Sequence, residues 1–447
     1  MLNFLDKKYT LQQVYGIEET PLKDCPTYVE RDVHKEFKYL VENESQHIIV
    51  YGASRQGKSW MVERYCTSFI RVGCDAKYDR SMLFKAILDE LKVIVGETKT
   101  SNEYKCGNKI KASGEGNIEI PFVAKAKAAG TGEISDEGSK SKEVTYLNVD
   151  LNNQSEVIKA IKKVLGNRFI VIENFHYLNI ETQKAFAGSL REFLYHKIRV
   201  IIVGVWKETT KLSSYASDLT NRCEYIDIGN WNSNELKEIV KKGDKALKIH
   251  TDEKVVDLFI NNSGYNVGIF KSLLKNFYKE CKIFETQSQQ RNLSDIGKAN
   301  RAIDKCYDEV ISPVLERIDN LATSKKPGAK GMRYYIVEAI LNLISKKDVE
   351  EILNGIDYQD ILDEIHELKA PHFDSSNIKQ ELISLHLREE TGKSGKGTNK
   401  NIIPLFYFDR AKSNGKLFIV ESALICFKQS GKLKLHSYLG PIDNYVK

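Results

Sequence analysis

Residues 52–59 have the spacing Gly-x-x-x-x-Gly-Lys-Ser, a pattern that binds polyphosphates. Gly52 and Gly57 permit backbone angles that a side chain forbids, so successive amide groups can turn inward around phosphate oxygens. Lys58 supplies a positive charge to the terminal phosphates, and the Ser59 hydroxyl can coordinate magnesium. We therefore predict a site for ATP and Mg²⁺. The expected binding residues are Gly52, Ala53, Ser54, Arg55, Gln56, Gly57, Lys58, Ser59 and Trp60.

The segments on either side of this loop favour nucleotide binding over a glycine-rich turn without a ligand. Ile48–Tyr51 is a short apolar run typical of a buried strand, and we predict a helix over Trp60–Ile70. The N-terminal end of that helix would add positive potential where the anion lies. An amphipathic helix around Arg31–Asn43 precedes the strand.

Further strands and helices alternate along the next 180 residues. The apolar runs Arg168–Glu173, Arg199–Gly204 and Cys223–Ile228 predict buried strands, and helical patterns cover Ser155–Leu165 and Thr182–His196. Alternation of this kind predicts an α/β fold with a parallel sheet covered on both faces.

The strand that ends at Glu173 predicts the metal and catalytic residues. Glu173 can hold magnesium together with Ser59, but the next residue is Asn174, and an amide cannot accept a proton at neutral pH. If Asn174 occupies the position of the catalytic base, hydrolysis should be slow or should depend on another group such as His176. We favour a surface histidine over a catalytic one for His176.

Arg222 directly precedes the last of these strands. Its guanidinium could reach the terminal phosphate of a nucleotide held by a neighbouring subunit, where it would stabilise the transition state or detect ATP. The alternative is an arginine that caps a helix C-terminus.

Several of these segments together resemble the AAA+ superfamily, and more narrowly compact prokaryotic origin-recognition and STAND-type ATPases. The resemblance rests on Gly52–Ser59, Phe169–Leu178, Val203–Trp206 and Asp218–Arg222 followed by Trp231. It implies nucleotide-driven self-assembly into a homo-oligomer, with a helical lid and a winged helix that relay the nucleotide state to a partner. DNA transactions, transposition or antiviral defence are the processes it implies.

Three positions depart from the family pattern. Asn174 replaces the second acidic residue, the Val200–Val205 strand does not end in a polar sensor, and Gly264–Lys271 lacks the lid arginine expected near Gly268 or Ile269. Each departure removes a contact to the terminal phosphate. We therefore expect an ATPase with slow turnover.

The second half of the chain has a helical pattern that ends in a different arrangement. Tyr358–Leu368 and Asn377–Glu389 predict helices, and Ile402–Phe408 and Lys416–Val420 predict a hairpin before a short helix at Glu421–Lys428. This order is typical of a winged helix-turn-helix. The predicted divisions are an N-terminal segment over 1–45, a nucleotide-binding core over 46–230, a helical lid with connecting helices over 231–323, a linker over 324–333 and a winged-helix domain over 334–447. The lid helices are expected at Ser233–Leu247, Asp252–Ile260 and Val267–Phe284, followed by a helical pattern over Leu293–Ala322.

Two low-complexity segments have no assigned role. The repeat of residues 109–116 at 125–132 predicts a β insertion at about 100–143, either a solvated loop or a pairing element for another subunit. The run Gly392–Thr398 lacks the spacing of a second phosphate loop, and it is either a solvated basic loop or a contact for a DNA backbone through Lys393, Lys396 and Lys400.

Composition limits the remaining classes of protein. The chain of 447 residues is 41% hydrophobic and 29% charged, with no apolar run of membrane-spanning length and no secretory signal, so we expect a cytoplasmic protein with no membrane partner. Eight cysteines without CxxC spacing argue against a zinc module or a disulfide framework. The net charge of +6 does not identify a nucleic-acid binder. Two hypotheses remain: a slow ATPase switch that acts on a protein partner, and a regulator that binds double-stranded DNA and has a mainly structural nucleotide site.

Overall fold

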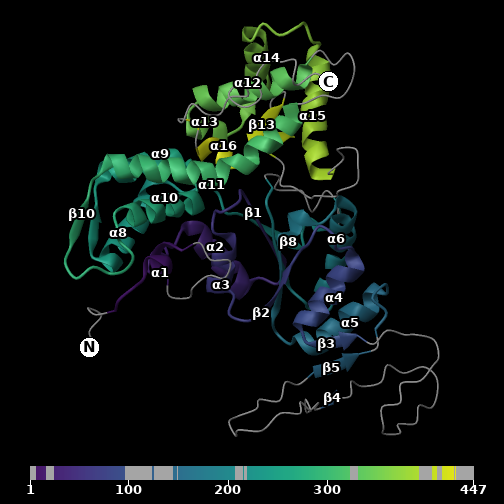
Figure 1. Cartoon of the computed structure of the whole chain (residues 1–447). Helices are drawn as coiled ribbons and strands as arrows, with labels where there is room; N and C mark the ends of the chain where they lie inside the picture. The colour runs from purple at the N-terminus through teal and green to yellow at the C-terminus, as the bar shows by residue number, and fades with distance from the viewer. Residues whose placement is uncertain are drawn as a thin grey trace, which may run out of the picture.

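The computed structural model in Figure 1 shows an α/β core, a helical region and a C-terminal unit that packs against that region. It describes residues 7–16, 25–95, 123–124, 144–147, 149–206, 215, 219–322, 331–391, 405–409, 415–426 and 428. Among the described helices, none combines the length and the apolar character that a bilayer crossing requires.

A five-stranded parallel sheet forms the centre of the core, in the order β2-β6-β7-β1-β8. The predicted parallel α/β fold is confirmed. The strands are β1 (His47–Tyr51), β2 (Phe69–Gly73), β6 (Phe169–Glu173), β7 (Val200–Val203) and β8 (Cys223–Asp227).

Helices cover both faces of this sheet because its strands are apolar on both sides. On β1, Ile49 and Tyr51 point to one face, whereas Ile48 and Val50 point to the other. The first face packs against α4 (Arg80–Glu90), α5 (Gln154–Leu165) and α6 (Ile180–Tyr195), and the second against α2 (Asp32–Asn43) and α3 (Lys58–Tyr65).

The predicted helix over Trp60–Ile70 is too long. The helix α3 ends at Tyr65, because Cys66 already has an extended backbone, and Phe69 begins β2. In β2 the burial alternates with a period of two, which the apolar residues alone did not reveal. The strand β2, the helix α4 and the short strand β3 (Val93–Val95) were not predicted.

A second small sheet stands at the edge of the core. Its strands are β3, β5 (Val144–Leu147), which runs parallel to β3, and β4 (Val123–Ala124), which runs antiparallel to β5. Both copies of the predicted repeat, at 109–116 and 125–132, lie outside the described residues, and β4 falls between them.

The predicted lid helices are present with small shifts in their bounds. They are α8 (Ser233–Leu247), α9 (Glu253–Ser263) and α10 (Val267–Glu280), followed by α11 (Ile296–Ala322). Asn232, not Ser233, is the N-cap of α8, where its side chain and that of Glu235 form a capping box. Between them lie β9 (Ile249–Thr251) and β10 (Arg291–Leu293), and α1 (Leu11–Tyr15) packs onto α10 through Tyr15 and Tyr278.

The C-terminal unit combines helices with a three-stranded antiparallel sheet in the order β11-β13-β12. The described elements are α12 (Met332–Lys346), α13 (Val349–Leu353), β11 (Ile356–Asp357), α14 (Tyr358–Glu367), α15 (Ser375–Thr391), β12 (Phe406–Asp409), β13 (Lys416–Ile419) and α16 (Ala423–Cys426). Its apolar core is continuous with that of the lid helices. The winged-helix interpretation and the predicted domain boundaries stay predictions, and the basic run Gly392–Thr398 lies outside the described residues.

Candidate nucleotide-binding site

The loop that joins β1 to α3 has the backbone geometry of a phosphate cradle. Gly52 has a φ of 125° and Gly57 a φ of 93°, values that side chains rarely adopt. At Gly52 a Cβ would also lie 2.6 Å from Ile228 Cγ2. Both glycines are therefore required by conformation, as their spacing predicted.

Lys58 is buried at the first position of α3. Its ammonium donates to the carbonyl oxygens of Gly52 and Ala53, at 3.0 and 2.6 Å. These contacts hold the positive charge over the loop, where the phosphates of a nucleotide would lie.

The metal residues predicted from the sequence lie together. Ser59 Oγ donates to Glu173 Oε2 at 3.0 Å, and the Glu173 side chain is largely buried at the carboxyl end of β6. The other oxygen, Oε1, is buried and accepts no hydrogen bond from the described residues. Burial raises the pKa of Glu173, while Arg71, Ser59 and Lys58 oppose this shift. The oxygens of Ser59 and Glu173 are hard ligands of the kind that Mg²⁺ prefers, and Glu173 Oε1 has no hydrogen bond from the described residues. Phosphates and water would complete the coordination of the ion.

Arg71 on β2 is a neighbour of this carboxylate that sequence reasoning missed. Its Nε lies 3.8 Å from Glu173 Oε1, and its Nη2 donates to Glu63 Oε2 on α3 at 2.8 Å. A charged residue within an apolar strand was the available signal, but β2 itself was not predicted. Arg71 thus ties the metal carboxylate to the helix that follows the loop.

Asn174 and His176 both line the cavity beside Glu173. Asn174 has a left-handed backbone with a φ of 57°, which turns the chain from β6 into a short 3₁₀ helix at Phe175–Tyr177. His176 is half-buried, and its Nδ1 accepts the amide of Val205 at 3.2 Å. The choice between a surface and a catalytic role for His176 stays a prediction, because the side chain is partly exposed and also lines the cavity. The hydrogen bond to Val205 places the His176 ring beside the end of β7, where the sequence shows no polar sensor.

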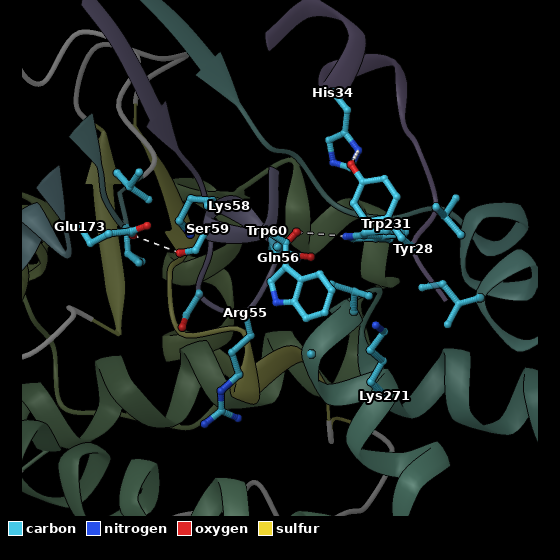
Figure 2. Close-up of a pocket in the computed structure, with 18 of the residues that line it drawn as sticks. Tyr28, His34, Arg55, Gln56, Lys58, Ser59, Trp60, Glu173, Trp231 and Lys271 are labelled. Atoms are coloured by element: carbon cyan, nitrogen blue, oxygen red, sulfur yellow. Dashed lines mark hydrogen bonds between the residues drawn. The ribbon is translucent and has the colours of Figure 1, made fainter. Parts of the chain in front are cut away.

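The loop opens into one cavity of about 250 Å³ that continues toward the N-terminal segment and the lid. Figure 2 shows Glu173, Ser59 and Lys58 at one end, and Tyr28, Trp231 and Lys271 at the other. Aromatic and apolar side chains of this second end are suited to a flat base. The lining residues that sequence reasoning missed include Tyr28, Val29, His34, Ile239, Val267 and Lys271.

Backbone contacts hold the lid directly against the phosphate loop. The amide of Gly268, in the first turn of α10, donates to Arg55 O at 3.0 Å. A Cβ at Gly268 would lie 2.6 Å from Arg55 Cβ, so the missing lid arginine could not stand here without moving the helix. The indole of Trp231 donates to Gln56 O at 3.2 Å from the start of the helical region.

Arg222 lies at the opposite end of the sheet from the loop. Its carbonyl accepts the amide of His47, the first residue of β1, whereas Gly52 follows the last. Five residues of strand separate the two ends by roughly 16 Å. Arg222 borders a groove formed with Arg191 and Tyr195 of α6, away from the cavity of its own chain. The alternative prediction is that Arg222 caps the C-terminus of a helix. Residues 216–218, just before Leu219, lie outside the described residues, so this alternative stays a prediction.

A solved structure with a similar fold covers most of this chain. The Walker-type ATPase PABY2304 of Pyrococcus abyssi is similar over 92% of this chain and 97% of its own, with a TM-score of 0.53 and 12% identity. The Orc1 protein of Aeropyrum pernix, solved in complex with DNA, is similar over 93% of this chain and 96% of its own, with a TM-score of 0.40 and 11% identity.

In sequence, the RuvB subunit of the Holliday junction branch migration complex from Mycoplasmopsis pulmonis is 22% identical over 196 residues. That match spans 39% of this chain and 61% of the relative. No family model matches the chain. The chain shares its overall fold with the Walker-type ATPase PABY2304, and this fold contains the parallel α/β sheet that the alternation of strands and helices predicted.

Proposed function

We propose that this chain is an ATP-binding switch ATPase that assembles on binding nucleotide and relays its state to a partner. The observation that carries the proposal is the contact of Ser59 with Glu173 at the mouth of a glycine-built loop. These two oxygens, the Lys58 ammonium and the loop amides converge on one cavity, which suits a magnesium-bound triphosphate.

The residues of the site divide the work of hydrolysis. Lys58 and the loop amides would bind the phosphates and offset their developing charge, and Ser59 and Glu173 would hold Mg²⁺, which supplies further charge neutralisation. Asn174 can orient a water molecule by hydrogen bonding but cannot remove its proton. Turnover should therefore be slow.

Arg222 is the residue we propose for contact between subunits. It stands at the far end of the sheet from the phosphate loop of its own chain and borders a groove beside α6, which supports a role at the site of a neighbouring subunit. Such an arrangement makes hydrolysis depend on assembly.

Asn266 supports a relay from the loop to the C-terminal unit. Its amide nitrogen donates both to Ser54 O in the loop, at 2.8 Å, and to Ser422 Oγ, at 3.0 Å, just before α16. Its side-chain oxygen caps α10 by accepting the amide of Ile269 at 3.1 Å. The fully buried side chain of Asn266 thus connects the loop, α10 and the segment before α16. A shift of the loop on nucleotide binding would therefore alter the hydrogen bond to Ser422.

Calorimetry and mass measurement on the purified chain test the proposal. We expect heat on titration with ATP and Mg²⁺, its loss in Lys58→Ala, and a larger assembly with ATP than without it. Arg222→Ala should bind ATP normally but lose assembly-dependent hydrolysis. Absence of binding to both ATP and GTP in the folded chain would refute the proposal.

The nature of the partner is a separate question with its own test. A protein effector and double-stranded DNA are the two candidates, and the C-terminal unit is the proposed contact. Binding of duplex DNA measured across salt concentrations separates them, because phosphate contacts produce a steep salt dependence. DNA binding that is absent or does not change with salt concentration would leave a protein effector as the proposed partner.

A further inference from the structure

Lys271 lines the candidate nucleotide cavity and has no counter-charge among the residues that the structure describes. It lies on α10, is half-buried and lines the cavity. Its ammonium is 4.0 Å from Cys25 Sγ and 5.1 Å from the centre of the Trp60 ring. Within the parts of the chain that the structure describes, it forms no ion pair with a carboxylate.

A buried ammonium without an anionic partner is unfavourable, and desolvation lowers the pKa of Lys271. The Trp60 ring offsets only part of this cost through a cation–π contact. An anionic group of a ligand would remove the remainder. The side chain therefore has the character of a binding residue, since among the described residues it contacts a thiol and an aromatic ring but no anion.

The position of Lys271 along the cavity indicates which group it meets. Trp60 follows Ser59 directly, and in Figure 2 its ring lies between Ser59 and Lys271, toward the end of the cavity that suits a base. Figure 2 shows Lys271 on that same side, apart from Lys58 and Glu173. A triphosphate with its terminal groups at Lys58 would direct its first phosphate toward Trp60 and Lys271.

We propose that Lys271 binds the α-phosphate of the nucleotide and thereby supplies the positive charge of the lid. This inference rests on the proposed ATP site. The helix α10 carries the charge one turn beyond Gly268, where direct packing on Arg55 excludes a side chain. The lid would then sense a phosphate that ATP and ADP share, and not the one lost in hydrolysis.

Binding of ATP and of ADP to matched variants tests the assignment. Lys271→Met nearly keeps the length of the side chain but removes its charge. The variant should bind ATP and ADP more weakly by the same factor, about 10- to 100-fold in Kd. Lys271→Arg should recover most of the affinity. Lys279→Met, at an exposed position of the same helix, should bind like the unchanged chain.

Phosphorus NMR of saturating ADP locates the contact. Between the unchanged chain and Lys271→Met, the α-phosphate resonance should shift while the β-phosphate resonance stays in place. Equal affinity in Lys271→Met, a loss for ATP alone, or an unmoved α-phosphate resonance would overturn the inference and leave the ATP site standing. If the unchanged chain binds no nucleotide, the proposed function itself fails.

Discussion

Ser59 Oγ donates a hydrogen bond to Glu173 Oε2 across 3.0 Å, and this contact joins the first turn of α3 to the carboxyl end of β6. The two residues lie 114 positions apart in the sequence. The strands β1 and β6 lie on either side of β7 and run parallel to it, so their carboxyl ends meet at one edge of the sheet. The geometry of the proposed metal position is therefore a product of strand order.

Glu173→Gln should separate nucleotide binding from hydrolysis. The amide keeps the shape of the side chain but removes the charge that would hold Mg²⁺, so phosphate release should fall about 100-fold or more. Binding of ATP without metal should change little, because Lys58 and the loop remain. Unaltered phosphate release in this variant would remove Glu173 from the metal site.

Asn174→Asp should raise the rate of hydrolysis. A carboxylate at this position could accept the proton of the attacking water, an effect of about 10²- to 10⁴-fold for a well-placed base. The left-handed backbone at Asn174 is also tolerated by aspartate, so the fold should be kept. The measurement is steady-state phosphate release.

The control for this prediction is Asn261→Asp, which adds the same charge at an exposed position of α9 away from the cavity. It should turn over like the unchanged chain. If Asn174→Asp gives no gain, the base position lies elsewhere, and His176 becomes the next residue to test.

Gly268→Ala should destabilise the chain and weaken nucleotide binding. Alanine normally favours a helix over glycine, but here its Cβ would lie 2.6 Å from Arg55 Cβ and 3.0 Å from Arg55 O. Moving α10 away from the loop should cost about 1–3 kcal/mol in the free energy of unfolding. Denaturant titration measures this loss.

The matched comparison is Gly188→Ala in α6, where an added Cβ meets nothing within 4 Å. There we expect a gain in stability of about 0.5–1 kcal/mol from helix propensity. Gains at both positions would show that the lid does not pack on the loop as described.

Acid should destabilise the fold through His47. The imidazole is fully buried, with Nδ1 accepting the amide of Val200 at 3.1 Å and Nε2 donating to Leu190 O at 2.9 Å. Burial lowers its pKa to about 4, below the unfolded value near 6.5. The unfolded chain therefore binds more protons between these values. As the pH is lowered through this window, the free energy of unfolding should decrease by about 3 kcal/mol.

Denaturant titrations from pH 7 to pH 4 check this expectation in the unchanged chain and in His47→Gln. The variant should be less stable at pH 7 but should lose less stability on acidification. Part of the slope should persist, because burial also lowers the pKa of His34 to about 4. The exposed His250→Gln should keep the full slope. An unchanged slope in His47→Gln would mean that His47 is not the buried neutral group described.

Local sequence was sufficient for features that depend on neighbouring residues. The spacing of Gly52 and Gly57, the apolar run that becomes β6 and the alternation of strands with helices predicted the loop, the strand that ends at Glu173 and the parallel sheet. Each follows from backbone freedom or from burial on both faces of a strand, and neither requires knowledge of distant contacts.

Only the tertiary structure decided which distant groups meet in the cavity. The sequence shows no relation between Lys271 and Trp60, between Asn266 and Ser422, or between His176 and the end of β7, because these contacts depend on how the lid and the C-terminal unit pack on the loop. The chain by itself determined that a phosphate cradle forms, since glycine spacing acts locally. Packing between elements far apart in sequence decided which side chains complete it.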